Sequence, residues 1–222
     1  MCGRYSFVVE DGLILERFGI RVRTAIYKAR YNCAPAQDLA VISNEDPLSL
    51  SFYRWGLIPY WSKDPAIGNK LINARAETLT EKPSFKNAFH NRRCLVPATG
   101  FFEWRRGKEK TPFNIRMKSG EPFSLAGLWD KWVSSDGQII YSFAIITTIP
   151  NELISGIHNR MPVILQRNDE KKWLETGPES NLTVLLKPYP SDTMEAYPVK
   201  SLVNSPRNDT PDILKPLPTT LL

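Results

Sequence analysis

The stretch FSLAGLWDKWVSSDGQIIYSFAIITT, residues 123–148, holds two hydrophobic runs, Phe123–Trp132 and Ile139–Thr148, on either side of Asp136-Gly137. Both runs are rich in aromatic and branched residues that favour strands, and Asp-Gly is a preferred dipeptide of tight hairpin turns. The sequence therefore predicts a long β-hairpin here. Shorter strands are expected before it at 94–96, 101–105 and 113–117, with another hairpin turn at Ser119-Gly120.

Strands and short helices alternate on both sides of this hairpin. Further strands are expected at 5–9, 41–43, 48–57, 163–165, 182–186 and 196–199. Short helices are expected at 11–18 with Gly19 just beyond, around 85–89, and from Asn168 to Leu174. The tail from about 205 to 222 has four prolines and is expected to be an extended surface strap. These patterns predict one α+β domain over 1–222, mainly antiparallel strands in a barrel-like arrangement with short flanking helices.

Composition limits the classes of function. The chain has 222 residues and 42% hydrophobic content, enough for one domain with a sizeable core. Lys+Arg 29 against Asp+Glu 23 gives +6, which suggests a polyanionic partner but is also compatible with an ordinary soluble surface. No apolar run approaches membrane-spanning length, and the N-terminus lacks the pattern of a signal peptide. We therefore expect a cytoplasmic protein with no membrane partner.

Cysteine and histidine usage gives little reason to expect a metal. Cys2, Cys33 and Cys94 are widely spaced and form no CxxC pair, so neither a disulfide framework nor a zinc motif is indicated. The only histidines are His90 and His158, and no acidic cluster accompanies them. We expect neither a metal nor another cofactor.

The first residues, Met1-Cys2-Gly3-Arg4-Tyr5, offer a distinctive nucleophile. Initiator methionine is normally removed before a small residue, which would leave Cys2 with a free α-amine beside its thiol. The α-amine has a reference pKa of about 7.7–8.0 against about 10.4 for lysine, so far more of it is unprotonated near neutral pH and can form a Schiff base with an aldehyde. The thiol can then close onto the imine as a thiazolidine. The alternative is that Cys2 is only a small buried hydrophobe.

Two polar or aromatic stretches could contact nucleic acid. Trp61, beside Ser62-Lys63, could stack on a base while the lysine meets a phosphate, although core packing is the usual fate of tryptophan. Asn73 and Arg75 lie two residues apart and so share one side of an extended segment. Together they suit a phosphodiester or a reacting oxygen. A structural Asn turn with an Arg–Glu77 pair is the competing interpretation.

Two further stretches carry candidate acid–base groups. Strand alternation places Phe102 and Trp104 on one face and Phe101 and Glu103 on the other. Burial among aromatics would raise the pKa of Glu103 into the range of proton transfer, whereas a solvent-facing Glu would have no special property. His158 stands in a loop beyond a hydrophobic strand, where functional residues often lie. A lone histidine is more often structural, as His90 is expected to be.

Several motifs occur in an order that resembles a known family, the SOS-response-associated peptidase (SRAP) proteins that shield abasic sites. They are Met1-Cys2-Gly3-Arg4-Tyr5, Tyr31-Asn32-Cys33-Ala34-Pro35, Trp55-Gly56-Leu57-Ile58-Pro59, Asn73-Ala74-Arg75-Ala76-Glu77-Thr78, Arg93-Cys94-Leu95-Val96-Pro97-Ala98, Gly100-Phe101-Phe102-Glu103-Trp104 and His158-Asn159-Arg160-Met161-Pro162. The resemblance runs from residue 2 to about 200. One departure is Asn159, where the family often has aspartate, and it leaves the pKa of His158 open.

The resemblance implies a basic channel for single-stranded DNA and a covalent thiazolidine between Cys2 and the ring-opened abasic sugar. It also implies catalytic roles for Asn73, Glu103 and His158, and phosphate contacts from Arg4 and Arg75. Further candidates for DNA contact are Trp61 and Trp104, as stacking surfaces, and Arg160. Lyase and peptidase activity are possible accompaniments. Two other functions fit the same residues: an N-terminal-cysteine autopeptidase or amidohydrolase, and a non-covalent reader of modified bases. Protein partners are not indicated.

Overall fold

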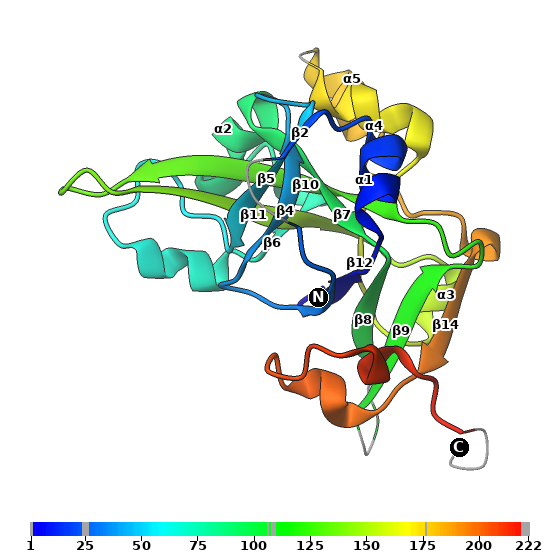
Figure 1. The fold of residues 1–222 in the computed structure, drawn as a ribbon. Coiled ribbons are helices and arrows are strands. Elements are labelled where there is room, and N and C mark those ends of the chain that lie inside the picture. Colours follow the sequence, from blue (N-terminus) through cyan, green and yellow to red (C-terminus); the bar gives the residue numbers. More distant parts are fainter. Residues whose placement is uncertain (1, 24–26, 106, 108–109, 176, 219–222) are drawn as a thin grey trace.

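The computed structural model describes residues 2–23, 27–105, 107, 110–175 and 177–218, and short helices surround a core of strands (Figure 1). The strands are β1 (Tyr5–Phe7), β2 (Val22–Arg23), β3 (Arg30–Cys33), β4 (Asp38–Ser43), β5 (Ser49–Trp55), β6 (Asn73–Arg75), β7 (Arg93–Ala98), β8 (Gly100–Arg105), β9 (Thr111–Met117), β10 (Phe123–Val133), β11 (Ile139–Thr148), β12 (Met161–Pro162), β13 (Ile164–Leu165) and β14 (Met194–Pro198). The α-helices are α1 (Asp11–Phe18), α2 (Pro83–Asn91), α3 (Glu152–Ser155), α4 (Arg167–Leu174) and α5 (Glu179–Thr183). Within the described residues, no helix has the length and apolar content needed to cross a membrane.

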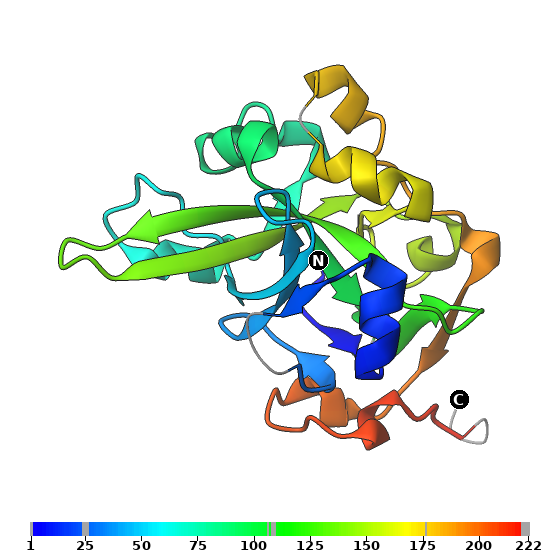
Figure 2. The ribbon, with the colours of Figure 1, turned by 45° about the horizontal axis from the view of Figure 1, so that its top comes forward.

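Five strands close into a barrel. The order is β5-β4-β7-β10-β11, each neighbouring pair is antiparallel, and a parallel pairing of β11 with β5 closes the ring. The long β10–β11 hairpin turns at Asp136-Gly137 as predicted and projects from the barrel (Figures 1 and 2). Gly137 has φ +86°, which explains the need for glycine at this turn. The predicted barrel-like α+β arrangement is confirmed.

A second sheet lies against the barrel, with the order β14-β9-β8-β1-β3 (Figure 1). Its strand β8 is buried through its first four residues because the barrel core covers one face and the C-terminal segment covers the other. In Figures 1 and 2 strand β1, at the start of the chain, lies near the middle of the molecule rather than at its periphery, and Cys2 is fully buried. The second sheet thus carries the N-terminal residues into the interior.

Three local predictions need correction. Ser119-Gly120 does not form a hairpin, because β9 and β10 belong to different sheets and do not pair. Residues 182–186 are not a strand: Leu182 lies in α5, and the chain continues as a turn that packs Leu185 and Leu186 into the core. The tail contains a 3-10 helix, Pro211–Leu214, in addition to extended backbone, and 219–222 lie outside the described residues.

Arg93 is a fully buried arginine that ties two helices to the barrel. Its guanidinium donates to the backbone oxygens of Phe89 and His90 in α2 and of Trp173 and Glu175 at the end of α4, at 2.6–2.8 Å. The last carbonyls of a helix have no partner within the helix, and a cation there also complements the helix dipole. One side chain therefore satisfies the ends of both helices.

Replacing Arg93 with methionine is expected to destabilise the fold strongly. The substitution leaves four carbonyl oxygens without their donor, and each buried unsatisfied group costs about 1–3 kcal/mol. We expect a loss of at least about 3 kcal/mol, measured by denaturant unfolding. Arg116→Met is the matched control: Arg116 forms an exposed pair with Glu195, of a kind worth about 1 kcal/mol or less. Equal losses in the two variants would contradict the proposed role of Arg93.

Candidate functional site

The N-terminal residues meet Glu103 because β1 pairs with β8. Tyr5 faces Phe101 across this antiparallel pair, and the backbone N–H of Phe102 donates to the Arg4 oxygen at 2.9 Å. As predicted, alternation along β8 separates two faces: Phe101 enters the barrel core, and Phe102 packs on the other face with the C-terminal segment. Cys2 and Glu103 are close enough for the Glu103 charge to perturb the Cys2 thiol.

The other candidate residues meet at the end of β11. There β6 pairs with β11 in parallel. Strand β12 also pairs with β11, antiparallel, at Thr147 and Thr148. The first pairing delivers Asn73 and Arg75, and the second fixes the loop that carries His158 just before it. A close contact between two glycines helps β6 to reach its place: a Cβ on Gly56 would lie 2.6 Å from the Gly68 oxygen. Segments far apart in sequence are thereby joined.

Cys2 is completely buried, and a hydrogen bond to its backbone carbonyl fixes its position. The Asn73 side-chain amide donates to the Cys2 carbonyl oxygen at 2.8 Å, and the Cys2 sulfur lies 4.0 Å from the Arg4 oxygen. The Oδ1 atom of Asn73 is also buried and makes no hydrogen bond to any described residue. This oxygen is available to accept from an amine or a sugar hydroxyl at the site.

Burial shifts the acid–base properties of the thiol and of its neighbour. Burial first, and then the Glu103 charge, raise the pKa of the Cys2 thiol well above its ordinary value. Burial also raises the pKa of Glu103 to about 7, against the opposing hydrogen bond from the Trp104 backbone. A carboxyl with this pKa can accept or release a proton near neutral pH. It can therefore act as the base for the neighbouring thiol, which is protonated.

His158 is oriented by its own loop. Its Nδ1 accepts from the Arg160 backbone N–H at 3.1 Å and lies 4.0 Å from Glu103 Oε1, with little of either side chain exposed. The same Nδ1 lies 3.2 Å from the Arg160 carbonyl oxygen, so both backbone groups of Arg160 hold this ring nitrogen. The arrangement therefore fixes the imidazole beside a carboxyl group.

The three predicted cationic contacts have different surroundings. Arg75 is exposed at the end of β6 and forms no ion pair with any described acidic residue. Arg4 is half-buried and donates to Asn32 Oδ1 at 3.0 Å; burial lowers its pKa, but a guanidinium stays charged at neutral pH. Arg160 instead forms a two-pronged pair with Glu77 at 2.7 and 2.9 Å and donates to the Thr147 oxygen. These bonds favour a structural role for Arg160.

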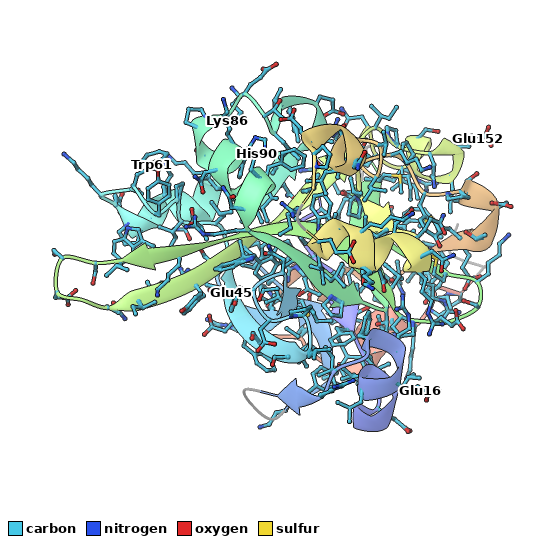
Figure 3. The ribbon with its side chains drawn as sticks, turned by 90° about the horizontal axis from the view of Figure 1, so that it is seen from above. Glu16, Glu45, Trp61, Lys86, His90 and Glu152 are labelled. Atoms are coloured by element: carbon cyan, nitrogen blue, oxygen red, sulfur yellow. The ribbon has the colours of Figure 1, made fainter. Side chains whose placement is uncertain are left out.

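The two tryptophans also differ. Trp61 is 47% exposed and stands out from its loop near the projecting hairpin (Figure 3). Its ring is free to stack on a base. Trp104 donates to Asn204 Oδ1 at 2.8 Å and packs with the C-terminal segment, which limits the ring surface that it offers to a ligand.

Sequence reasoning assigned no role to two residues that border the site, Asn32 and Asp209. Asn32 lies in one of the quoted motifs and binds Arg4, whereas Asp209 lies in a tail that was expected only to cover the surface. The spacing in the sequence suggests Arg75 as the partner of Glu77, but Glu77 binds Arg160. The described residues contain no group of three histidine, cysteine or acidic side chains placed to hold a metal. A groove of about 910 Å³ between α1 and α4 contains none of the site residues.

Comparison with known proteins agrees with these observations. The profile of the family described as SOS response associated peptidase (SRAP) matches residues 1–206. The chain is 48% identical to the abasic site processing protein YoqW of Bacillus subtilis, covering 97% of this chain and 99% of that one. It is 31% identical to the abasic site processing protein HMCES of Xenopus tropicalis, covering 85% and 66%. A crystal structure of a Bacteroides thetaiotaomicron protein superposes with a TM-score of 0.90 at 32% identity, covering 98% and 100%.

Proposed function

Because the chain belongs to the SOS response associated peptidase family, we propose that it processes abasic sites in DNA, as its relatives are named for doing. We further propose that it captures the abasic sugar covalently through Cys2 after removal of Met1, in single-stranded DNA. The observation that carries the proposal is the convergence of the buried Cys2, a carboxyl with a pKa of about 7 at Glu103, and His158 at 4.0 Å from that carboxyl. Each has a part in the capture of an aldehyde.

The first step is attack on the aldehyde. The open form of an abasic sugar has a C1′ aldehyde, and the α-amine of Cys2 adds to it, loses water and gives an imine. Asn73 holds the Cys2 carbonyl, and its free Oδ1 can accept from the amine. His158 protonates or stabilises the sugar oxygen that ring opening releases.

The second step closes the ring. The thiol adds its sulfur to the imine carbon, and its proton must leave because burial keeps the thiol protonated. Glu103 accepts that proton and passes it to the imine nitrogen, which becomes the ring N–H, and the reverse transfers open the ring when the adduct reverses. The net change is aldehyde plus aminothiol giving thiazolidine plus water. Closure protects the strand, since a bare imine acidifies C2′ and promotes β-elimination.

A denaturing gel tests the proposal. Processed protein is incubated with a single-stranded oligonucleotide that carries one abasic site, with a duplex of the same sequence, and with a tetrahydrofuran analogue that lacks the aldehyde. We expect a heat-stable shifted band with the abasic single strand only. Binding without any shifted band would favour a non-covalent reader, and release of peptide fragments without DNA would favour the autopeptidase.

Arg75→Ala is expected to weaken DNA binding through a lost phosphate contact. Arg75 is exposed beside Asn73, and each lost contact to a single strand flattens the slope of log affinity against log salt by about 0.7. Fluorescence anisotropy with an undamaged single strand measures this slope. The matched control is Lys171→Ala, which removes an exposed cation on α4 that lies outside the site. A slope in Arg75→Ala equal to that of the control would count against a phosphate contact.

A further inference from the structure

We infer that the C-terminal segment 199–216 forms part of the DNA site, because it fixes the direction of Arg4 through two positioning residues, Asn32 and Asp209. This inference rests on the proposed contact between Arg4 and a phosphate. The segment is closed at its base by a bridge between Val199 and Pro216 and by a bond from the Leu217 N–H to the Pro198 oxygen. It behaves as a bounded loop rather than a loose end.

Asn32 is fully buried and connects this loop to Arg4. Its Nδ2 donates to the backbone oxygens of Ser205 and Asn208 at 2.9 and 2.7 Å, with a longer bond of 3.4 Å to Val203. These carbonyls decide which way the amide faces, because only the nitrogen can donate to them. The Oδ1 is consequently turned to Arg4 Nη1, at 3.0 Å.

Asp209 holds the loop against the strand that carries Asn32. Its carboxylate accepts from the backbone N–H groups of Tyr31 and Asn32 at 2.6 and 2.8 Å and pairs with Arg30 Nε at 2.6 Å. Bonds to a charged acceptor are about twice as strong as neutral ones, so this anchor is stronger than the loop's other polar contacts. Ile213 adds an apolar anchor, buried beside Phe102 on the outer face of β8.

The bond to Asn32 fixes the orientation of the Arg4 guanidinium without neutralising its positive charge. Among the described residues, Arg4 forms no ion pair with an acidic side chain, and its buried Nε has no hydrogen-bond partner. An arginine held by a neutral amide keeps its full charge and its remaining donors for an anion. Asn32 thus supplies position, while Arg4 supplies the charge that meets the phosphate.

The test compares two aspartates of the same loop. Asp209→Ala and Asp212→Ala each remove one negative charge, which by itself would strengthen DNA binding. Asp212 is exposed and pairs with Lys215 of the same loop, so it serves as the control. We expect Asp209→Ala to bind undamaged single strands more weakly, with a salt slope lower by about 0.7, the value for one lost contact. Asp212→Ala should keep the wild-type slope.

A double variant separates positioning from general loosening. In an Arg4→Ala background, Asp209→Ala should change the slope no further, because the contact that it positions is already absent. Additive effects, or equal slopes for Asp209→Ala and Asp212→Ala, would overturn the inference. An unchanged slope in Arg4→Ala alone would instead overturn the proposed phosphate contact itself. If Asp209→Ala melts far below wild type, Asp209→Asn takes the place of Asp209→Ala in the same comparison. Asparagine keeps a side-chain oxygen that can accept from the backbone N–H groups.

Discussion

Cys2→Ala is expected to reduce the heat-stable crosslink to abasic DNA to background. The variant keeps the α-amine, so it still forms an imine, but it has no sulfur to close the ring. The imine should therefore be visible only after borohydride reduction, and cleavage of the abasic strand should increase because the imine permits β-elimination. A denaturing gel resolves the crosslinked, cleaved and intact strands in one experiment.

The matched control for this variant is Cys94→Ala. Cys94 is also fully buried, but it lies in the barrel against Gly127 and takes no part in the site. It should keep the crosslink, with any loss of stability visible by thermal melting. A heat-stable adduct of normal yield in Cys2→Ala would refute thiazolidine formation. Loss of the adduct in both variants would show that a buried thiol is needed for folding rather than for capture.

Glu103→Gln is expected to slow both formation and reversal of the crosslink by about 10²–10⁴-fold, the usual contribution of a general acid–base group. Glutamine has nearly the same shape but cannot transfer a proton. DNA affinity should change little, since Glu103 is buried and carries no positive charge for phosphate. Single-turnover kinetics measure the rates, and Glu195→Gln, an exposed glutamate on β14, is the matched control.

The pH dependence identifies the proton carrier. Formation needs the ionised carboxylate, so in the wild type its rate should rise as pH increases through about 7, the raised pKa of Glu103. Reversal needs the protonated acid and should fall across the same range. Both inflections should disappear in Glu103→Gln, while an inflection from the α-amine, with a reference pKa of about 7.7–8.0, remains. Wild-type rates and profiles in this variant would remove Glu103 from the mechanism.

Local patterns predicted much of the fold. Alternation along Gly100–Arg105 correctly separated the faces of β8, and the Asp136-Gly137 dipeptide correctly placed the turn of the long hairpin. The failures occurred where long-range pairing decides the outcome. Ser119-Gly120 has turn chemistry, but the chain passes there from one sheet to the other, and no local signal records which strands will pair.

The candidate site shows the same division. The sequence indicated Cys2, Glu103 and His158 by residue type and resemblance, and the fold places His158 Nδ1 4.0 Å from Glu103 Oε1. It gave no reason to link Asp209 with Asn32, because an aspartate in a proline-rich tail has many possible partners on the surface. The partner of Glu77 was also missed: Arg75 is near in sequence, but Arg160 is the residue that the strand pairing brings to it.

The burial of Cys2 has a consequence for synthesis on the ribosome. Cys2 is buried in the folded chain, in which β1 pairs with β8. Tyr5 can pair with Phe101 only after the ribosome has added Phe101 to the chain. At about 5–20 residues per second, synthesis of those hundred residues takes roughly 5–20 s. During that interval the N-terminus has no β8 partner to cover it, and aminopeptidases can reach it. The proposed chemistry requires removal of Met1. We expect this removal to occur during synthesis, before β1 and β8 pair.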